Sequence, residues 1–311
     1  MTLGYDRPLY LLAFDHRGSF EKGLFGTEEP VSDEVKAGIA DAKEIIFEGH
    51  LEAVKSGAVP AAAAGVLVDE EFGASVARKA KSAGTPLAMP VERSGQEEFQ
   101  FQYGDDFAVH IEAFDPTFAK VLVRYNPDGD AALNQRQTER LARLSRWLRE
   151  HDRRFLFELL VPATTEQLDR YEGQSAYDKE LRPSLVVEVI QRLQSADVEP
   201  DVWKIEGLSE AEDCRRTVAQ AQSGGRDGVV CIILGRGADE AQVFEWLRVA
   251  ASVKGFDGFA VGRTIWFDAL QSFLAGHVSR AEAVHTIAGR YKEMYDAYVS
   301  ATATTTATPA R

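Results

Sequence analysis

Short apolar runs rich in β-branched residues recur along the chain, with amphipathic stretches between them. Each run is almost continuously apolar, which is typical of strands buried on both faces of a parallel sheet. The stretches between the runs carry apolar residues at helical spacing and charged residues elsewhere, which predicts surface helices. The eight predicted strands are residues 9–14, 65–68, 86–91, 119–125, 155–161, 202–205, 229–234 and 258–261.

Capping signals mark where several of the predicted helices begin. Ser32 precedes an acidic first turn and predicts a helix over residues 32–55. The tetrapeptides that begin at Ser209 and Ser279 both read Ser-x-x-Glu, the pattern of a capping box. The remaining predicted helices are residues 134–150, 184–195, 238–253 and 281–298.

Eight strand-then-helix units in a chain of this length predict an α/β protein that forms a single (β/α)8 TIM barrel over residues 1–298. An open doubly wound sheet is the alternative, but it would normally have a glycine-rich turn after its first strand. Here that turn reads Asp-His-Arg-Gly-Ser-Phe from Asp15. Residues 299–311 are Ala/Thr-rich and are expected to be disordered.

Composition narrows the function classes. The net charge of −14 argues against nucleic acid or an anionic membrane as a partner of the whole surface. Only Cys214 and Cys231 are present, and the six histidines lack metal-ligand spacing, so we expect no disulfide framework, no metal and no cofactor. The chain shows neither a signal peptide nor an 18-residue apolar run, and a cytoplasmic protein is expected. Oligomeric state is left open, a homo-oligomer included.

Lys204 and Glu158 are the strongest candidates for catalytic residues in the sequence. Lys204 lies in a buried strand, where desolvation disfavours the ammonium form, and a neutral amine forms a Schiff base with a carbonyl carbon. Glu158 lies on the neighbouring predicted strand between leucines of its own face. A buried carboxylate there needs a cation, and Lys204 is the predicted partner. A purely structural ion pair is the alternative.

Other charged residues also follow or end the predicted strands, where a barrel places its active face. They are predicted to contact substrate: Asp15, His16, Arg17, Lys120 and Glu206. The last two strands end in Gly235-Arg236 and Gly262-Arg263. Loops at these two positions commonly bind phosphate in barrels, because glycine lets backbone amides approach and arginine adds paired hydrogen bonds.

The ordered motifs resemble those of the class I tagatose 1,6-bisphosphate aldolase family. They resemble even more the aldolase-like C-terminal domain of bacterial 5-dehydro-2-deoxygluconokinase proteins. Four motifs carry the resemblance: Ala-Phe-Asp-His-Arg from Ala13, Glu-Leu-Leu-Val-Pro from Glu158, Trp-Lys-Ile-Glu-Gly from Trp203, and Val-Gly-Arg-Thr-Ile-Trp from Val261. His16 stands where the tagatose enzymes usually have glutamine, and this chain carries no kinase segment, so the sugar and the pathway stay open.

The resemblance implies a metal-independent aldolase in which Lys204 forms the Schiff base and Glu158 is the acid and base. Asp15, Lys120 and Arg263 would line the substrate and phosphate site. The substrate would be a phosphorylated ketose or keto sugar acid, such as 2-deoxy-5-keto-gluconate 6-phosphate, tagatose or fructose bisphosphate, or a sulfofructose phosphate. The products would be dihydroxyacetone phosphate and an aldehyde. Another Schiff-base barrel enzyme, such as a transaldolase, and a non-catalytic sugar-phosphate-binding barrel are the alternatives.

Overall fold

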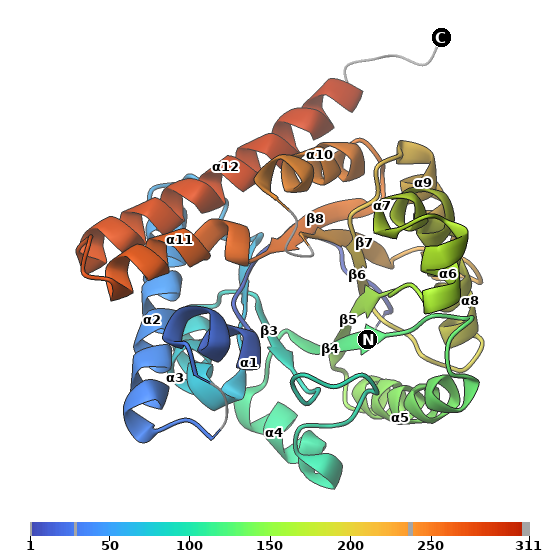
Figure 1. Cartoon of the computed structure of the whole chain (residues 1–311), viewed down its shortest axis with the longest axis horizontal. Coiled ribbons are helices and arrows are strands. Elements are labelled where there is room, and N and C mark those ends of the chain that lie inside the picture. Colours follow the sequence, from blue (N-terminus) through green and yellow to red (C-terminus); the bar gives the residue numbers. More distant parts are fainter. Residues whose placement is uncertain (1, 28–29, 236–238, 307–311) are drawn as a thin grey trace.

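The computed structural model describes residues 2–27, 30–235 and 239–306, and it confirms the predicted (β/α)8 barrel. Parallel strands close into a ring in the order β1-β2-β3-β4-β5-β6-β7-β8, with helices around the outside (Figure 1). The strands are β1 Leu9–Ala13, β2 Ala64–Leu67, β3 Leu87–Pro90, β4 Phe118–Arg124, β5 Arg154–Leu160, β6 Val202–Glu206, β7 Val230–Leu234 and β8 Phe256–Val261. Each coincides with a predicted run to within two residues.

Helices follow the strands around the ring. Those of eight residues or more are α2 Asp33–Lys55, α3 Glu70–Ser82, α4 Phe107–Phe114, α5 Ala131–Glu150, α8 Arg182–Gln194, α9 Ala211–Ala221, α10 Glu240–Ala251, α11 Arg263–Leu274 and α12 Arg280–Thr306. The shorter ones are α1 Gly18–Phe20, η1 Glu21–Phe25, η2 Gly104–Asp106, α6 Thr165–Arg170, α7 Gln174–Ala176 and η3 Tyr177–Leu181.

Two buried clusters hold the barrel together. The smaller one fills the barrel interior with side chains such as Leu11, Phe118 and Leu156. The larger one contains the alternate strand residues, for example Phe157 and Trp203, packed under the surrounding helices. Successive side chains of a strand point to opposite faces, so continuous apolar strands supply both clusters.

The helix ends test the capping predictions. Ser32 caps α2 through a hydrogen bond from Val35 N, and Ser279 exchanges hydrogen bonds with Glu282 at the start of α12. The capping box expected at Ser209 is wrong. There Glu210 is the N-cap of α9 and makes no side-chain capping bond, while Glu212 accepts a hydrogen bond from Arg215.

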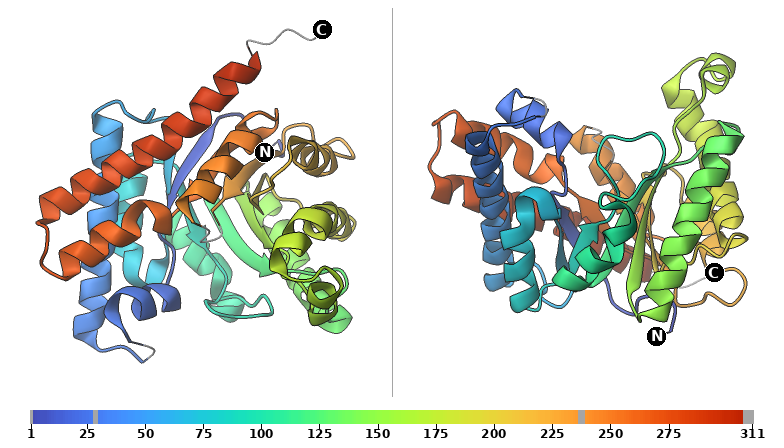
Figure 2. Two further views of the ribbon diagram at one scale, coloured as in Figure 1. Left: turned by 45° about the horizontal axis from the view of Figure 1, so that its top comes forward. Right: turned by 90° about the horizontal axis from the view of Figure 1, so that it is seen from below.

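Helix α12 corrects the expected boundary of the disordered tail. It continues to Thr306, so residues 299–306 are helical, while residues 307–311 lie outside the described part of the chain. The helix crosses the outside of the barrel over α10, α11 and α2 (Figure 2). Tyr291 and Tyr298 donate hydrogen bonds from α12 to Tyr10 O and Phe256 O of the barrel. Alanine favours continuation of a helix that is already anchored in this way.

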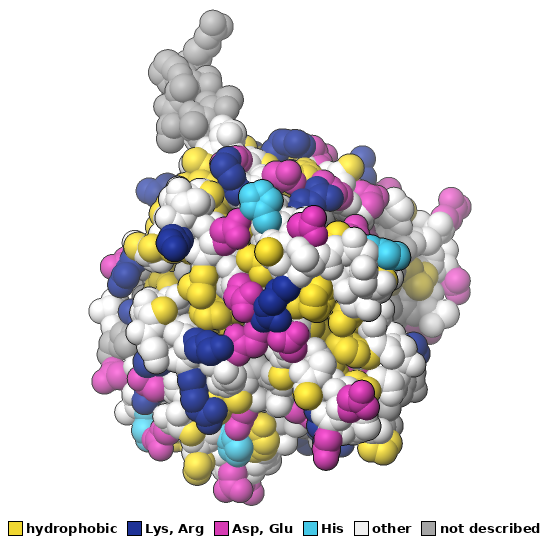
Figure 3. Space-filling model, turned by 90° about the vertical axis from the view of Figure 1, so that its left-hand side faces the viewer, with side chains coloured by type: hydrophobic (Ala, Val, Ile, Leu, Met, Phe, Trp, Pro, Cys, Tyr) yellow, Lys and Arg dark blue, Asp and Glu magenta, His cyan; other side chains and the backbone are white. Residues whose placement is uncertain are grey.

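The face that carries α2 and α12 mixes acidic, basic and apolar side chains (Figure 3). Arg280 of α12 pairs there with Asp41 and Glu48 of α2, so its charge is balanced locally. Among the described helices, none is both long enough and apolar enough to cross a membrane.

Candidate active site

A cavity of about 460 Å³ opens where the carboxyl ends of the strands meet. Its lining comes from the ends of β1, β4, β5, β6, β7 and β8 and from the loop after β3. Most of the residues predicted to form a site line this cavity: Asp15, His16, Arg17, Lys120, Glu158, Lys204, Gly235, Gly262 and Arg263.

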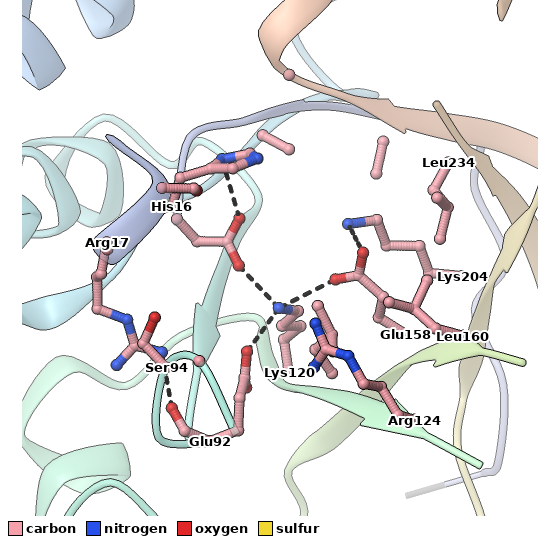
Figure 4. Close-up of a pocket in the computed structure, with 18 of the residues that line it drawn as sticks. His16, Arg17, Glu92, Ser94, Lys120, Arg124, Glu158, Leu160, Lys204 and Leu234 are labelled. Atoms are coloured by element: carbon pink, nitrogen blue, oxygen red, sulfur yellow. Dashed lines mark hydrogen bonds and ion pairs between the residues drawn. The ribbon is translucent and has the colours of Figure 1, made fainter. Parts of the chain in front are cut away.

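Lys120 is the centre of the charged cluster in this cavity (Figure 4). Its Nζ lies 2.8 Å from Asp15 Oδ2, 2.7 Å from Glu92 Oε1 and 3.0 Å from Glu158 Oε2. The three carboxylates reach it from the segments after β1 and β3 and from β5, and the Lys120 side chain is 1% exposed. Lys120 therefore neutralises charge that would otherwise repel across the barrel mouth.

Lys204 meets Glu158 as the sequence predicts. The register of β5 and β6 pairs the two residues directly, and Lys204 Nζ lies 2.8 Å from Glu158 Oε1. Both side chains are buried, at 5% and 9% exposure. The Glu158 carboxylate thus bridges two lysines, with one oxygen on Lys204 and the other on Lys120.

Burial and the neighbouring positive charges shift the pKa values of the acidic residues in the cluster in opposite directions. Burial disfavours the carboxylate of Glu158, but Lys120 and Lys204 outweigh this effect and lower its pKa. The same balance lowers the pKa of Asp15, where Lys120 is the strongest favourable charge. Burial prevails at Glu92 and raises its pKa despite Lys120 and Arg17.

The pKa of Lys120 shifts in the direction opposite to that of an isolated buried lysine. Burial disfavours its ammonium, but Asp15, Glu158 and Glu92 together raise its pKa well above the usual value. Lys120 therefore stays charged at neutral pH and is a poor nucleophile, because its nitrogen lone pair is protonated.

The segment after β1 is held by a buried lysine of α2. Lys43 Nζ donates hydrogen bonds to Phe14 O and His16 O, at 2.8 and 3.0 Å, and pairs with Asp69. Lys43 was not predicted as part of the site, because a single lysine in a helical pattern does not reveal which loop it contacts. Its bonds fix the backbone that carries Asp15 into the cavity.

His16 and Arg17 lie at one side of the cavity. Burial lowers the pKa of His16 to about 4 although Asp15 opposes the shift, so the imidazole is neutral at pH 7. Arg17 donates from Nη2 to Glu92 O at 2.7 Å and from Nη1 to Gln102 Oε1 at 3.2 Å. Arg17 therefore joins the end of β1 to the loop after β3.

The predicted phosphate loops are only partly described. Gly235 and Gly262 line the cavity, and Arg263 begins α11 without a side-chain N-cap. A Cβ on Gly262 would lie 2.2 Å from Ala13 O, so contact with β1 alone already requires this glycine. Arg236 lies outside the described residues.

Glu206 is placed differently from the prediction that it contacts substrate. Strand alternation puts it on the same face of β6 as Lys204, but it is absent from the cavity lining. One of its oxygens instead accepts a hydrogen bond from Val161 N at 2.8 Å. Glu206 thus supports the end of β5. Glu92, which follows β3, was not among the predicted site residues, yet it contacts Lys120 directly.

The cluster does not form a metal-binding arrangement. Across the residues that the structure describes, no three His, Cys, Asp or Glu side chains are grouped as ligands for a metal ion. The point where Asp15, Glu92 and Glu158 converge is taken by the Lys120 ammonium.

The chain matches the model of a bacterial protein family and is similar to a curated aldolase. The model of a family described as "Uncharacterized protein conserved in bacteria (DUF2090)" matches residues 5–302. A tagatose 1,6-diphosphate aldolase of Listeria monocytogenes serotype 4b is 28% identical over 200 residues, which make up 63% of this chain and 54% of that relative. The chain thus spans about half the length of the curated relative it matches. This similarity confirms the resemblance to tagatose aldolases seen in the motifs.

Solved structures share the fold at lower identity. An archaeal fructose 1,6-bisphosphate aldolase matches with a TM-score of 0.56 and 15% identity over 94% of both chains. A structure of an archaeal fructose-1,6-bisphosphate aldolase with the catalytic lysine covalently bound to the carbinolamine intermediate matches with a TM-score of 0.53 and 17% identity. That match covers 89% of this chain and 94% of the other. At these identities the likeness concerns the fold.

Proposed function

We propose that this chain, which belongs to the DUF2090 family of bacterial proteins, is a class I aldolase with Lys204 as the Schiff-base lysine. The observation that carries the proposal is the unequal environment of two buried lysines beside one carboxylate. Lys120 pairs with three carboxylates, whereas among the described residues Glu158 is the only carboxylate at ion-pair distance from Lys204. Only Lys204 can give up its proton without leaving several buried carboxylates unpaired.

Glu158 is suited to move the protons of imine formation. Lys204 transfers a proton to Glu158, and the free amine then adds to the substrate carbonyl. Glu158 returns the proton as the carbinolamine loses water, which leaves a protonated imine. Lys120, 3.0 Å from the other oxygen of Glu158, stabilises the carboxylate whenever it is ionised.

Cleavage uses the same pair. The protonated imine accepts the electrons of the bond between its α and β carbons, and Glu158 takes the proton of the hydroxyl on the departing β carbon. An aldehyde leaves and an enamine stays on Lys204. Protonation of the enamine and hydrolysis then release the second product. With a phosphorylated ketose or keto sugar acid as substrate, that product is dihydroxyacetone phosphate.

Reductive trapping tests the proposed function directly. We expect incubation with dihydroxyacetone phosphate and borohydride to add the reduced ligand to the peptide that contains Lys204, as seen by mass spectrometry. Omission of borohydride is the control, because an unreduced imine hydrolyses during digestion. A label on Lys120 would contradict the assignment, and the absence of any adduct would favour a sugar-phosphate-binding barrel without catalysis.

Replacement of Arg263 tests the proposed phosphate site. Arg263 follows β8 at the edge of the cavity, while Lys120, another cation that lines the cavity, already pairs with carboxylates. We expect Arg263→Ala to raise KM for a phosphorylated substrate by about tenfold to a hundredfold, the worth of a charge-assisted contact. The same variant should change KM for the unphosphorylated analogue far less. Equal changes for both substrates would place the phosphate elsewhere.

A further inference from the structure

The ladder between β5 and β6 ends directly after the two residues proposed to react. The paired register of these strands ends at Leu159 and Ile205, one residue beyond Glu158 and Lys204. Backbone hydrogen bonds fix the relative position of two strands only as far as the ladder continues. The placement of Glu158 against Lys204 therefore depends on the contacts that hold the backbone just beyond them.

Val161, the first residue after β5, is held by side chains at both of its backbone groups. Its N–H donates to Glu206 Oε2 at 2.8 Å, and its carbonyl oxygen accepts a hydrogen bond from Tyr177 Oη at 2.9 Å. Glu206 is the last residue of β6, and Tyr177 is a fully buried residue of η3. Side chains thus take over from the ladder and join the end of β5 to the end of β6.

Arg182 makes the corresponding contact at the end of β6. Its Nη2 donates to Gly207 O at 2.7 Å, and its Nε donates to Asp178 Oδ1 at 2.9 Å. Gly207 is the first residue after β6, and a Cβ added to it would clash with the ring of Trp246. The backbone beyond Lys204 is therefore held between a guanidinium and an indole ring.

The burial of Arg182 is not explained by stability alone. Its side chain is 2% exposed, and its Nη1 makes no hydrogen bond to a described residue. Burial of a guanidinium costs free energy, and apolar residues in place of a buried ion pair often leave a protein equally stable or more stable. A buried arginine with an unsatisfied donor next to the end of β6 therefore points to a role in fixing position.

We propose that Tyr177 and Arg182 are positioning residues that clamp the carboxyl ends of β5 and β6 and so set the geometry between Glu158 and Lys204. This inference rests on the proposed aldolase function and adds to it two residues that do not line the cavity. Both belong to the chain between β5 and β6, which passes outside the barrel (Figure 1).

The proposed chemistry is sensitive to this geometry. Proton transfer between Lys204 Nζ and Glu158 Oε1 requires hydrogen-bond distance, and the two atoms lie 2.8 Å apart. A displacement of about 1 Å can lower a rate by about a hundredfold. Because Tyr177 and Arg182 lie outside the cavity, their loss should lower kcat and leave KM nearly unchanged.

Replacement of Tyr177 with phenylalanine tests the contact to β5, because it removes a single hydroxyl group. Tyr291→Phe is the matched control, since Tyr291 is also buried and donates to a backbone oxygen, Tyr10 O of β1, at 2.6 Å. Each variant loses one buried hydrogen bond, so the unfolding temperature should fall by a similar amount in both. We expect kcat to fall by about tenfold or more in Tyr177→Phe and to stay near the wild-type value in Tyr291→Phe. Equal kcat in the two variants would show that Tyr177 only stabilises the fold and would overturn the inference.

Arg182→Met tests the contact to β6 in the same way. Its control is Arg226→Met, because Arg226 donates from Nε and Nη2 to Glu199, at 2.7 and 2.6 Å, before the start of β6. Both variants lose a partly or fully buried guanidinium, but only Arg182 holds the carboxyl end of the strand. We expect the selective loss of kcat, again about tenfold or more, in Arg182→Met alone. Equal losses of kcat in both variants would contradict the clamp, and Tyr177→Phe decides the inference if Arg182→Met does not fold.

Hydrogen exchange separates this inference from the proposed reaction, because it requires no substrate. Exchange at the Val161 amide, followed by mass spectrometry of peptides that contain it, should be about fivefold faster in Tyr177→Phe, the scale of one lost hydrogen bond. The same amide should exchange at the wild-type rate in Tyr291→Phe. A wild type that made no aldol product would contradict the proposed function, and this exchange would still decide whether Tyr177 holds the strand end. Unchanged exchange in Tyr177→Phe, or faster exchange with unchanged kcat in an active enzyme, would overturn the inference.

Discussion

Replacement of Lys204 with methionine is expected to abolish turnover, with kcat reduced on the order of 10⁴-fold or more, as for loss of a covalent nucleophile. Methionine fills a similar volume but cannot form an imine. The fold should survive, because Glu158 keeps Lys120 as a cationic partner 3.0 Å away. Steady-state kinetics and a thermal unfolding curve on the same preparation measure both quantities.

Lys204→Arg is the matched control for charge. Its guanidinium retains a cation beside Glu158 but is not a nucleophile at neutral pH. If the role of Lys204 were only to pair with Glu158, this variant would keep most of its activity, and that result would contradict the imine mechanism. We expect both variants to be inactive and to yield no borohydride adduct.

The Glu158–Lys204 pair could be predicted from the sequence because strand geometry settles it. Alternation directs Glu158 and Lys204 to the interior of the barrel, and adjacent parallel strands lie about 4.8 Å apart. The observed register pairs the two residues directly. In a closed barrel, two interior residues at matching heights on adjacent strands have little choice but to meet. This part of the site therefore follows from the alternation of residues along the strands.

The triple contact of Lys120 could not be predicted in the same way. Asp15 and Glu92 lie in segments after their strands, where the backbone is set by loop contacts rather than by sheet geometry. Those contacts include the bonds of Lys43 to the segment after β1. A helical pattern shows that Lys43 belongs to a helix but not that it reaches this loop.

Glu206 shows the limit of arguments from alternation. The alternation of β6 directs its side chain inward, yet its carboxylate accepts a hydrogen bond from Val161 N. A buried backbone N–H requires an acceptor, and the nearest carboxylate supplies it. Such local demands compete with substrate binding at every strand end, and they are not visible in the spacing of residues.

Glu158→Gln is expected to lower kcat by about 10²-fold or more, the scale of a positioned proton-transfer group, with a smaller effect on KM. Lys120 and Lys204 outweigh burial and lower the pKa of Glu158 below its usual 4.5, so the carboxylate is ionised at neutral pH. In the wild type, kcat/KM should therefore decrease in acid only below about pH 4.5, where Glu158 becomes protonated. This decrease should be absent from Glu158→Gln.

Glu92→Gln is the matched control, because Glu92 contacts Lys120 at 2.7 Å but lies outside the Lys204 pair. Both substitutions remove one negative charge from Lys120, so any effect of that loss alone appears in both variants. We expect Glu92→Gln to retain a kcat well above that of Glu158→Gln, with the unfolding temperature of each variant measured alongside. Near-native turnover in a folded Glu158→Gln would show that the carboxylate only balances charge. Equal losses in the two variants would instead assign the effect to Lys120, and the proton transfers of imine formation would need another group.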